Sequence, residues 1–179
     1  MNKAIKTKNK ISHALIELLN NKPLDLITIK ELTEKAEISR TAFYNNFNNL
    51  DDVLKYIYQK EHKKIFKEKY SQLSYVYSDE HILDMIHFFD KNTKLLIVLI
   101  KWNLIALIAK YNTEIVLSYT QHYNNKFIRD NAFYFISYYH SSLFNICTYW
   151  IINGKQESVE SLFRMIKQFE KIKFVQNNI

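Results

Sequence analysis

The chain has 179 residues, and it contains one glycine, one proline and one cysteine and carries a formal net charge of +7. So few glycines and prolines argue against sheets joined by tight turns, and they exclude the glycine-rich loops that hold phosphates in nucleotide-binding folds. The lone cysteine, Cys147, leaves no disulfide within one chain, and we expect it to be a small core residue. The composition therefore predicts an all-α protein.

The positive charge is concentrated towards the N-terminus. Residues 1–70 hold 14 Lys and Arg against 9 Asp and Glu, whereas residues 71–179 hold 11 against 9. The first ten residues form a basic arm with no acidic residue, carrying Lys3, Lys6, Lys8 and Lys10. Such an arm suits a polyanion, although a solvated terminus can have the same composition.

No segment is typical of a membrane span or a secretory leader. The most apolar stretch, residues 95–109, is interrupted by Lys101 and Asn103. It falls short of the ~18–20 continuous apolar residues that a span needs. The N-terminus lacks an apolar segment followed by a small-residue cleavage site. We therefore expect a soluble, cytoplasmic protein with no membrane partner and no cofactor.

Two short helices are predicted within the first 36 residues. The first ends near Asn20, before a loop that contains Pro23. The second opens with a capping box, in which Thr28 accepts a hydrogen bond from the backbone and Glu31 returns one. It ends near Ala36.

A third helix is predicted to begin at Ser39, a second N-cap candidate. Phe43 and Phe47 follow at i, i+4 spacing and, with Ile38, are expected to face inward. Two helices this close, the second short and polar on its outer face, predict a helix-turn-helix.

Longer helices are predicted for the rest of the chain. One begins after Asn49 and extends to about Gln72, and another begins near Ser78. The segment 95–109 is too uniformly apolar for a surface helix and is expected to be central to a second domain. Residues 111–123 continue the helical pattern.

The C-terminal third is predicted to hold two helices. A long one spans about 129–152 and ends at Gly154, a C′ glycine. His140 lies on its apolar stripe, where we expect a hydrogen-bonded core histidine. The last helix begins at Ser158. We divide the chain into a helix-turn-helix DNA-binding domain, 1–50, and a helical regulatory and dimerisation domain, 51–179.

The order of these features resembles the TetR/AcrR family of transcriptional regulators. The match is carried by AEISRTAFYNNF (36–47), with TIKEL (28–32) before it and DDVL (51–54) after it. It covers residues from about 8 to 55, and the rest agrees only in length, helical character and a closing pair of helices. Glu37 stands where the family usually has a turn glycine. Ala42 and Leu50 replace a common hydroxyl residue and a common lysine.

The polar face of the helix-turn-helix supplies the candidate DNA contacts. In such a motif the second helix enters the major groove while flanking elements hold phosphates. Arg40 can reach guanine O6 and N7 with a bidentate fork, or contact phosphate only. Tyr44 resembles the family tyrosine whose hydroxyl meets a phosphate. The candidate DNA-binding residues are Thr28, Lys30, Ser39, Arg40, Thr41, Tyr44, Asn45 and Asn46.

One such helix reads few bases, so we expect a homodimer on a pseudo-palindromic operator of double-stranded DNA. The last two helices are the candidates for dimerisation as a four-helix bundle with the partner's, although their apolar faces could be filled within one chain. The resemblance implies a repressor released by an effector, and the aromatic content suits a small lipophilic or aromatic one. The candidate lining residues are Phe89, Trp102, Tyr119, Tyr123, Phe133 and Tyr138.

Two other functions stay open at this point. A regulator of the same kind could be controlled by a protein partner and lack a small-molecule pocket. A helical enzyme or lipid-binding domain could carry an incidental helix-turn-helix. The sequence shows no nucleophile–base spacing, and its six histidines do not fall at i, i+4 on one helix. We therefore expect neither an enzyme nor a metal site.

Overall fold

A computed structural model describes residues 3–171 of the protein, and within them it contains helices and no strand. The all-α prediction is confirmed. The helices are α1 (Lys3–Leu19), α2 (Ile29–Lys35), α3 (Arg40–Tyr44), α4 (Leu50–Phe66), α5 (Leu73–Val76), α6 (Asp79–Lys91), α7 (Thr93–Lys101), α8 (Ile105–Thr120), α9 (Lys126–Asp130), α10 (Ala132–Ile152) and α11 (Val159–Lys171). Two 3₁₀ turns, Leu24–Leu26 and Lys69–Ser71, lie between them.

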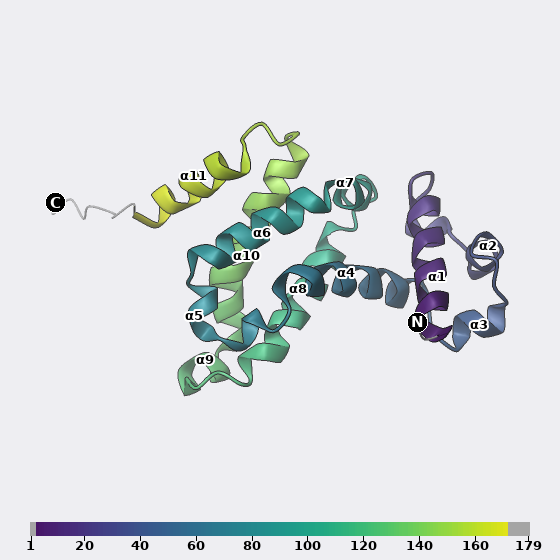
Figure 1. The fold of residues 1–179 in the computed structure, drawn as a ribbon, viewed down its shortest axis with the longest axis horizontal. Helices are drawn as coiled ribbons and strands as arrows, with labels where there is room; N and C mark the ends of the chain where they lie inside the picture. The colour runs from purple at the N-terminus through teal and green to yellow at the C-terminus, as the bar shows by residue number, and fades with distance from the viewer. Residues whose placement is uncertain (1–2, 172–179) are drawn as a thin grey trace.

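The helices form two groups joined by α4 (Figure 1). Helices α1–α3 gather at one end of the molecule, and we call them the three-helix unit. Helix α4 packs against α1 of this unit and against α6 and α8. Helices α4–α11 make the main body, in which α10 packs on α6, α7 and α8 while α11 packs mainly on α6. The body places α11 far from the three-helix unit.

The N-caps predicted at Thr28, Ser39 and Asn49 are confirmed, since each side-chain oxygen accepts a hydrogen bond from the backbone N–H three residues later. Ser78 caps α6 in the same way. The capping box at Thr28 is only half formed, because the Glu31 carboxylate pairs with Lys22 instead of the cap. Helix α10 ends as predicted, with Gly154 at a φ of +73°.

Three predicted helices are shorter than expected. Helix α4 stops at Phe66 rather than near residue 72, because Lys67 takes a φ of +44° and its carbonyl accepts from the Tyr119 hydroxyl at 3.1 Å. The apolar segment 95–109 is broken by a turn at Asn103, whose φ is +57°. The helix predicted from about 129 is divided at Asn131 into α9 and α10. Neither glycine nor proline marks any of these breaks.

The core of the main body contains a chain of buried polar groups. The Tyr58 hydroxyl donates to the Asn112 side chain at 2.9 Å, and the Asn112 amide in turn contacts His140. The Tyr70 hydroxyl lies 3.4 Å from Nδ1 of His140 and 3.3 Å from Nε2 of His81. His140 and Cys147 are both buried, so their predicted core positions are confirmed.

Burial gives these histidines unusual titration behaviour. It lowers the pKa of His62 to about 3 and that of His81 to about 4, and it holds the pKa of His140 well below its ordinary value. All three are therefore neutral in the folded protein at neutral pH. No helix of the described part of the chain is long and apolar enough to cross a membrane.

Candidate nucleic-acid interface

Helix α3 packs on the hydrophobic core through its aromatic face. Phe43 is fully buried and Phe47 is nearly so, their ring centroids lie 6.2 Å apart, and Ile38 packs against the same core. The Phe47 ring also meets Tyr56 of α4 edge-on at 5.6 Å. The predicted inward residues are confirmed, and they fix which face of α3 points to solvent.

The turn before α3 is made without glycine. Glu37 adopts a left-handed φ of +52°. Its N–H donates to the Glu34 carbonyl at 3.1 Å, and the next N–H, of Ile38, donates to the Thr33 carbonyl at 3.0 Å. This bond pattern is a Schellman motif, which usually places glycine at the left-handed position. Glu37 therefore holds a strained backbone, because a side chain disfavours positive φ.

The outer face of α3 is exposed and polar. Arg40, Thr41 and Tyr44 all lie at the surface, and Tyr44 keeps 51% of its accessible area. Within residues 3–171, the Arg40 side chain has neither an ion-pair nor a hydrogen-bond partner. An unpaired guanidinium beside a hydroxyl and a phenol can meet phosphates and base edges without first breaking a contact.

The remaining candidates flank this face. Thr28 and Ser39 use their side-chain oxygens as caps at 3.2 and 3.0 Å, which leaves each hydroxyl hydrogen free to donate to a phosphate. Lys30 is exposed in the first turn of α2. Asn45 and Asn46 lie just beyond the end of α3, and the Asn46 amide donates to the Ala42 carbonyl at 2.8 Å.

The basic arm is the first part of helix α1, and it is partly paired. Lys8 lies over the rings of Phe47 and Tyr56 at 5.3 and 5.2 Å, so it fastens α1 to α3 and α4. Lys10 pairs with Glu37 at 3.9 Å. Sequence reasoning missed both contacts, because they join residues far apart in the chain. The acid at the turn therefore has a nearby cation.

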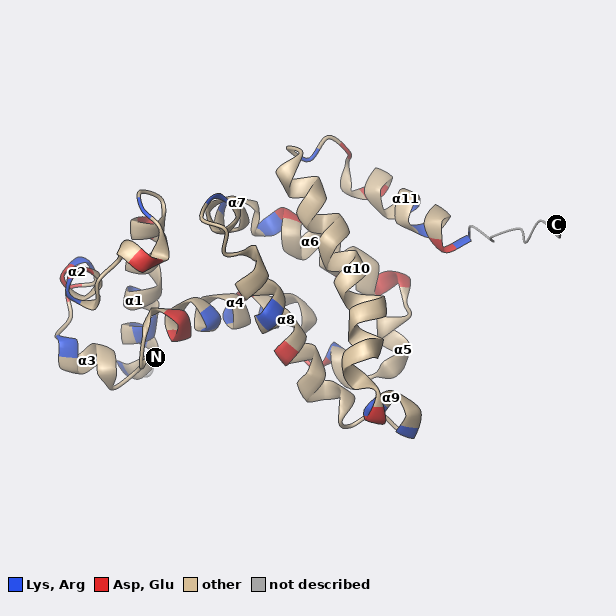
Figure 2. Ribbon diagram, turned by 180° about the vertical axis from the view of Figure 1, so that it is seen from behind, with Lys and Arg blue, Asp and Glu red and all other residues tan. Residues whose placement is uncertain are grey.

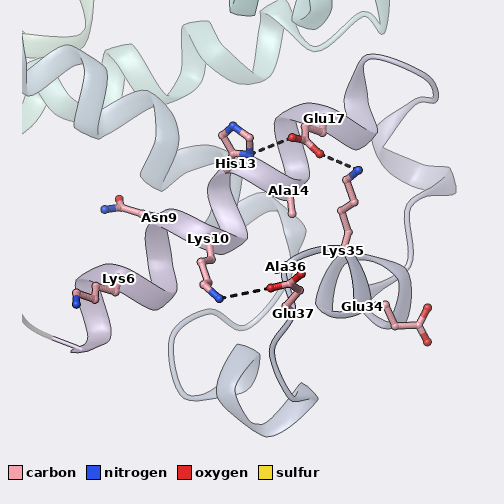
Figure 3. A pocket seen from close by; sticks show the side chains of 10 residues that line it. All are labelled: Lys6, Asn9, Lys10, His13, Ala14, Glu17, Glu34, Lys35, Ala36 and Glu37. Atoms are coloured by element: carbon pink, nitrogen blue, oxygen red, sulfur yellow. Dashed lines mark ion pairs between the residues drawn. The ribbon is translucent and has the colours of Figure 1, made fainter.

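A groove of about 820 Å³ runs between α1 and the α2 end of the turn (Figure 3). Two ion pairs cross it, Lys10 to Glu37 and Lys35 to Glu17, the second at 2.8 Å. The Lys35 hydrogen bond lowers the pKa of the Glu17 carboxyl. These ion pairs across the groove connect α1 to the end of α2 and to the turn, and so help to hold the helix-turn-helix against α1.

The six aromatic residues predicted to line an effector pocket are dispersed. Phe89 and Tyr123 are buried in the core, and Phe133 is exposed on α10. Trp102 donates its indole N–H to the Leu19 carbonyl. Tyr138 borders a groove of about 660 Å³ that lies between α6, α10 and α11. The structure does not bring the six together.

Helix α10 presents an uncharged apolar face. Its 21 residues include no Lys, Arg, Asp or Glu, and the ribbon carries neither charge colour there (Figure 2). Large apolar side chains at helical spacing nevertheless remain exposed along it: Tyr134, Tyr138, Tyr149 and Ile152. Met165 and Phe169 of α11 are exposed too, and a groove of about 690 Å³ lies between the two helices.

No group of three or more His, Cys, Asp or Glu side chains in residues 3–171 could hold a metal ion.

These features together define an all-helical fold, with a helix-turn-helix unit attached to a larger helical body. No protein-family model and no curated protein matches the chain. A solved structure does: the dihydroxyacetone kinase operon activator DhaS, with a TM-score of 0.52 over 92% of each chain and 20% identical residues. At this identity the likeness establishes the fold.

Proposed function

We propose that the chain is a dimeric, sequence-specific DNA-binding transcriptional regulator of the TetR kind, and a repressor. The observation that carries the proposal is α3 itself, a short helix whose buried face holds Phe43 and whose outer face exposes Arg40, Thr41 and Tyr44. Within residues 3–171, none of these three exposed side chains has an ion-pair or side-chain hydrogen-bond partner. Such a helix can enter the major groove, while α2 and the lysines of α1 lie beside the phosphates.

The test is binding to the DNA upstream of the chain's own gene. We expect Arg40→Ala to weaken specific binding by about 10- to 100-fold, because one bidentate contact to guanine contributes ~1–3 kcal/mol. Tyr44→Phe removes only the hydroxyl and should weaken binding to all sequences alike. Lys126→Ala, on α9 of the main body, is the matched control for a lost cation. If Arg40→Ala and Tyr44→Ala both bound this DNA as tightly as the wild type does, the proposal would be refuted.

The proposed dimer forms through α10 and α11. An uncharged helix face of exposed aromatic side chains is costly in water and suits a second copy of itself. Two such helix pairs would make a four-helix bundle. This arrangement also supplies the second recognition helix that a pseudo-palindromic operator needs.

For the effector we propose a small lipophilic or aromatic molecule that binds in the groove of about 660 Å³ bordered by Tyr138. Its lining also includes Tyr77, Tyr139 and several aliphatic side chains, and its size is that of a typical ligand site. A screen of aromatic compounds for release of bound DNA tests this, and Tyr139→Ala should weaken any hit.

A protein partner is the second candidate for control. It is favoured by the dispersal of the predicted lining residues and by Phe127, which is 76% exposed on α9. A screen that yields no releasing compound, together with a partner whose binding is lost in Phe127→Ala, would favour this alternative.

A further inference from the structure

Besides its packing along α4, the three-helix unit contacts the main body at the end of α1. Trp102, just past the end of α7, donates its indole N–H to the Leu19 carbonyl at 2.5 Å. The adjacent Lys101 ammonium reaches the Asn20 carbonyl at 3.4 Å. Lys101 also lies over the Trp102 ring at 4.5 Å, so the two donors form one group.

These donors supply what α1 lacks. The last carbonyls of a helix have no partner within the helix, and positive charge is favourable at that end. Helix α1 has no basic residue in its last turn. The carbonyls of Glu17 and Leu18 accept from Asn21, just past the helix. Those of Leu19 and Asn20 accept from Trp102 and Lys101, about 80 residues later in the chain and in the other group of helices.

A strained turn at Asn103 follows Trp102 and positions its indole against the end of α1. Asn103 has a φ of +57°, and the N–H of Leu104 returns to the Leu99 carbonyl at 2.8 Å. The same turn interrupts an otherwise continuous apolar segment between α7 and α8. A non-glycine residue held at positive φ costs free energy, and such strain is commonly kept where it positions a functional side chain.

The opposite edge of the unit is held through α4. The Tyr111 hydroxyl hydrogen-bonds to the Asp51 carboxylate, and Lys55 pairs with Glu114 at 2.7 Å, so the start of α4 is fixed to α8. A groove of about 600 Å³ lies between α1 and the α6–α7 corner, so side chains do not fill this junction. Helix α4 also packs along α1, where Lys60 donates to the Asn9 side chain at 2.8 Å, so the contact at Leu19 is a further point that sets the angle.

We infer that Trp102, with Lys101, is the positioning contact that fixes the orientation of the three-helix unit on the main body. The inference rests on the proposed function in one respect: in a dimer this angle sets the separation of the two recognition helices. Trp102 then acts through α1 and touches no DNA. Loss of the Trp102 contact leaves the binding of one recognition helix to one half-site unchanged, and it weakens the binding of both recognition helices to two half-sites at once.

The test compares Trp102→Phe with Trp150→Phe. Phenylalanine keeps an aromatic ring and removes the N–H donor. The control removes an equivalent bond, from the Trp150 indole to the Glu157 carbonyl at 3.0 Å, within the main body. Spin labels are attached to cysteines introduced at Glu34 and Lys110 of one chain, and labelled protein is diluted with unlabelled protein. The distance between the two labels reports the angle of the three-helix unit without DNA. The native Cys147 is buried and takes no label. We expect a broader distance distribution in Trp102→Phe alone.

On DNA, Trp102→Phe should weaken binding to a two-half-site duplex about tenfold, as for one lost hydrogen bond, and change binding to a single half-site less than twofold. Lys101→Met should act in the same direction, more weakly. Unchanged distances in Trp102→Phe would overturn the inference. An equal loss on both duplexes would also overturn it, since it would mean that Trp102 supports the unit's folding. Failure of the wild type to select any DNA would instead refute the proposed function, while the label distances would still test the contact.

Discussion

Helices α3 and α10 both expose aromatic side chains, but their neighbours differ. Tyr44 on α3 stands beside Arg40 and Thr41, and Lys8 of α1 lies over the ring of Phe47, just past α3. Tyr149 on α10 belongs to a stripe of aromatic and aliphatic side chains on a helix without a single Lys, Arg, Asp or Glu. An exposed aromatic ring beside a guanidinium suits a phosphate backbone, whereas a helix face of uncharged, largely apolar side chains suits another protein surface. The side chains around an exposed tyrosine, and not the tyrosine itself, therefore indicate which kind of partner it contacts.

The two regions also differ in their interiors. His62, His81 and His140 are buried in the main body, while the three-helix unit has only the exposed His13. Burial lowers the pKa of each of the three, so below pH ~6.5 the unfolded chain binds protons that the folded chain does not.

The largest expected effect is therefore acid destabilisation of the main body. The free energy of unfolding should decrease by about 4 kcal/mol from pH 7.5 to pH 5.5, with most of the loss below pH ~6.5. Each of the three histidines contributes up to ~1.4 kcal/mol per pH unit to this loss. Chemical denaturation at the two pH values measures this. His62→Phe, in a site that already stacks on Phe66, should remove about a third of the loss. Equal stability at both pH values would contradict the neutral, buried state of these side chains.

Charging the apolar face is the next largest perturbation. Tyr149→Asp should weaken self-association by about 100-fold, because an unpaired carboxylate buried in an interface costs ~3 kcal/mol or more. Phe127→Asp, on α9 and away from the stripe, is the matched control and should leave the dimer intact. Sedimentation velocity over a range of concentrations distinguishes them. If both variants, or neither, dissociate, α10 is not the interface.

The polar surface was easier to predict from sequence than the apolar one. Ser39 caps α3, and Phe43 and Phe47 share its buried face, because these relations lie within a few residues of one another. The breaks at Lys67 and Asn103 carry no glycine or proline, and contacts from distant residues stabilise them. Aromatic content alone could not tell that Phe89 lies in the core while Phe133 lies at the surface.

The smallest expected effect separates charge from strain at the turn. Glu37→Gly should stabilise the protein by about 1 kcal/mol, because glycine adopts the left-handed backbone without penalty. Glu37→Gln keeps the strain and should leave stability unchanged. Both should tighten DNA binding, since both remove an acid beside a polyanion. Thermal unfolding and binding titrations give the two readouts. A gain in stability from Glu37→Gln would contradict the role assigned to the backbone.

The central claim, that α3 reads DNA for a symmetric dimer, is tested most directly by selection of bound sequences from random double-stranded DNA. The expected result is an enriched pseudo-palindrome whose half-site centres lie about one helical turn apart, with Arg40→Ala losing preference at a guanine in each half. Enrichment of no sequence, or of one that Arg40→Ala and the wild type select alike, would contradict it.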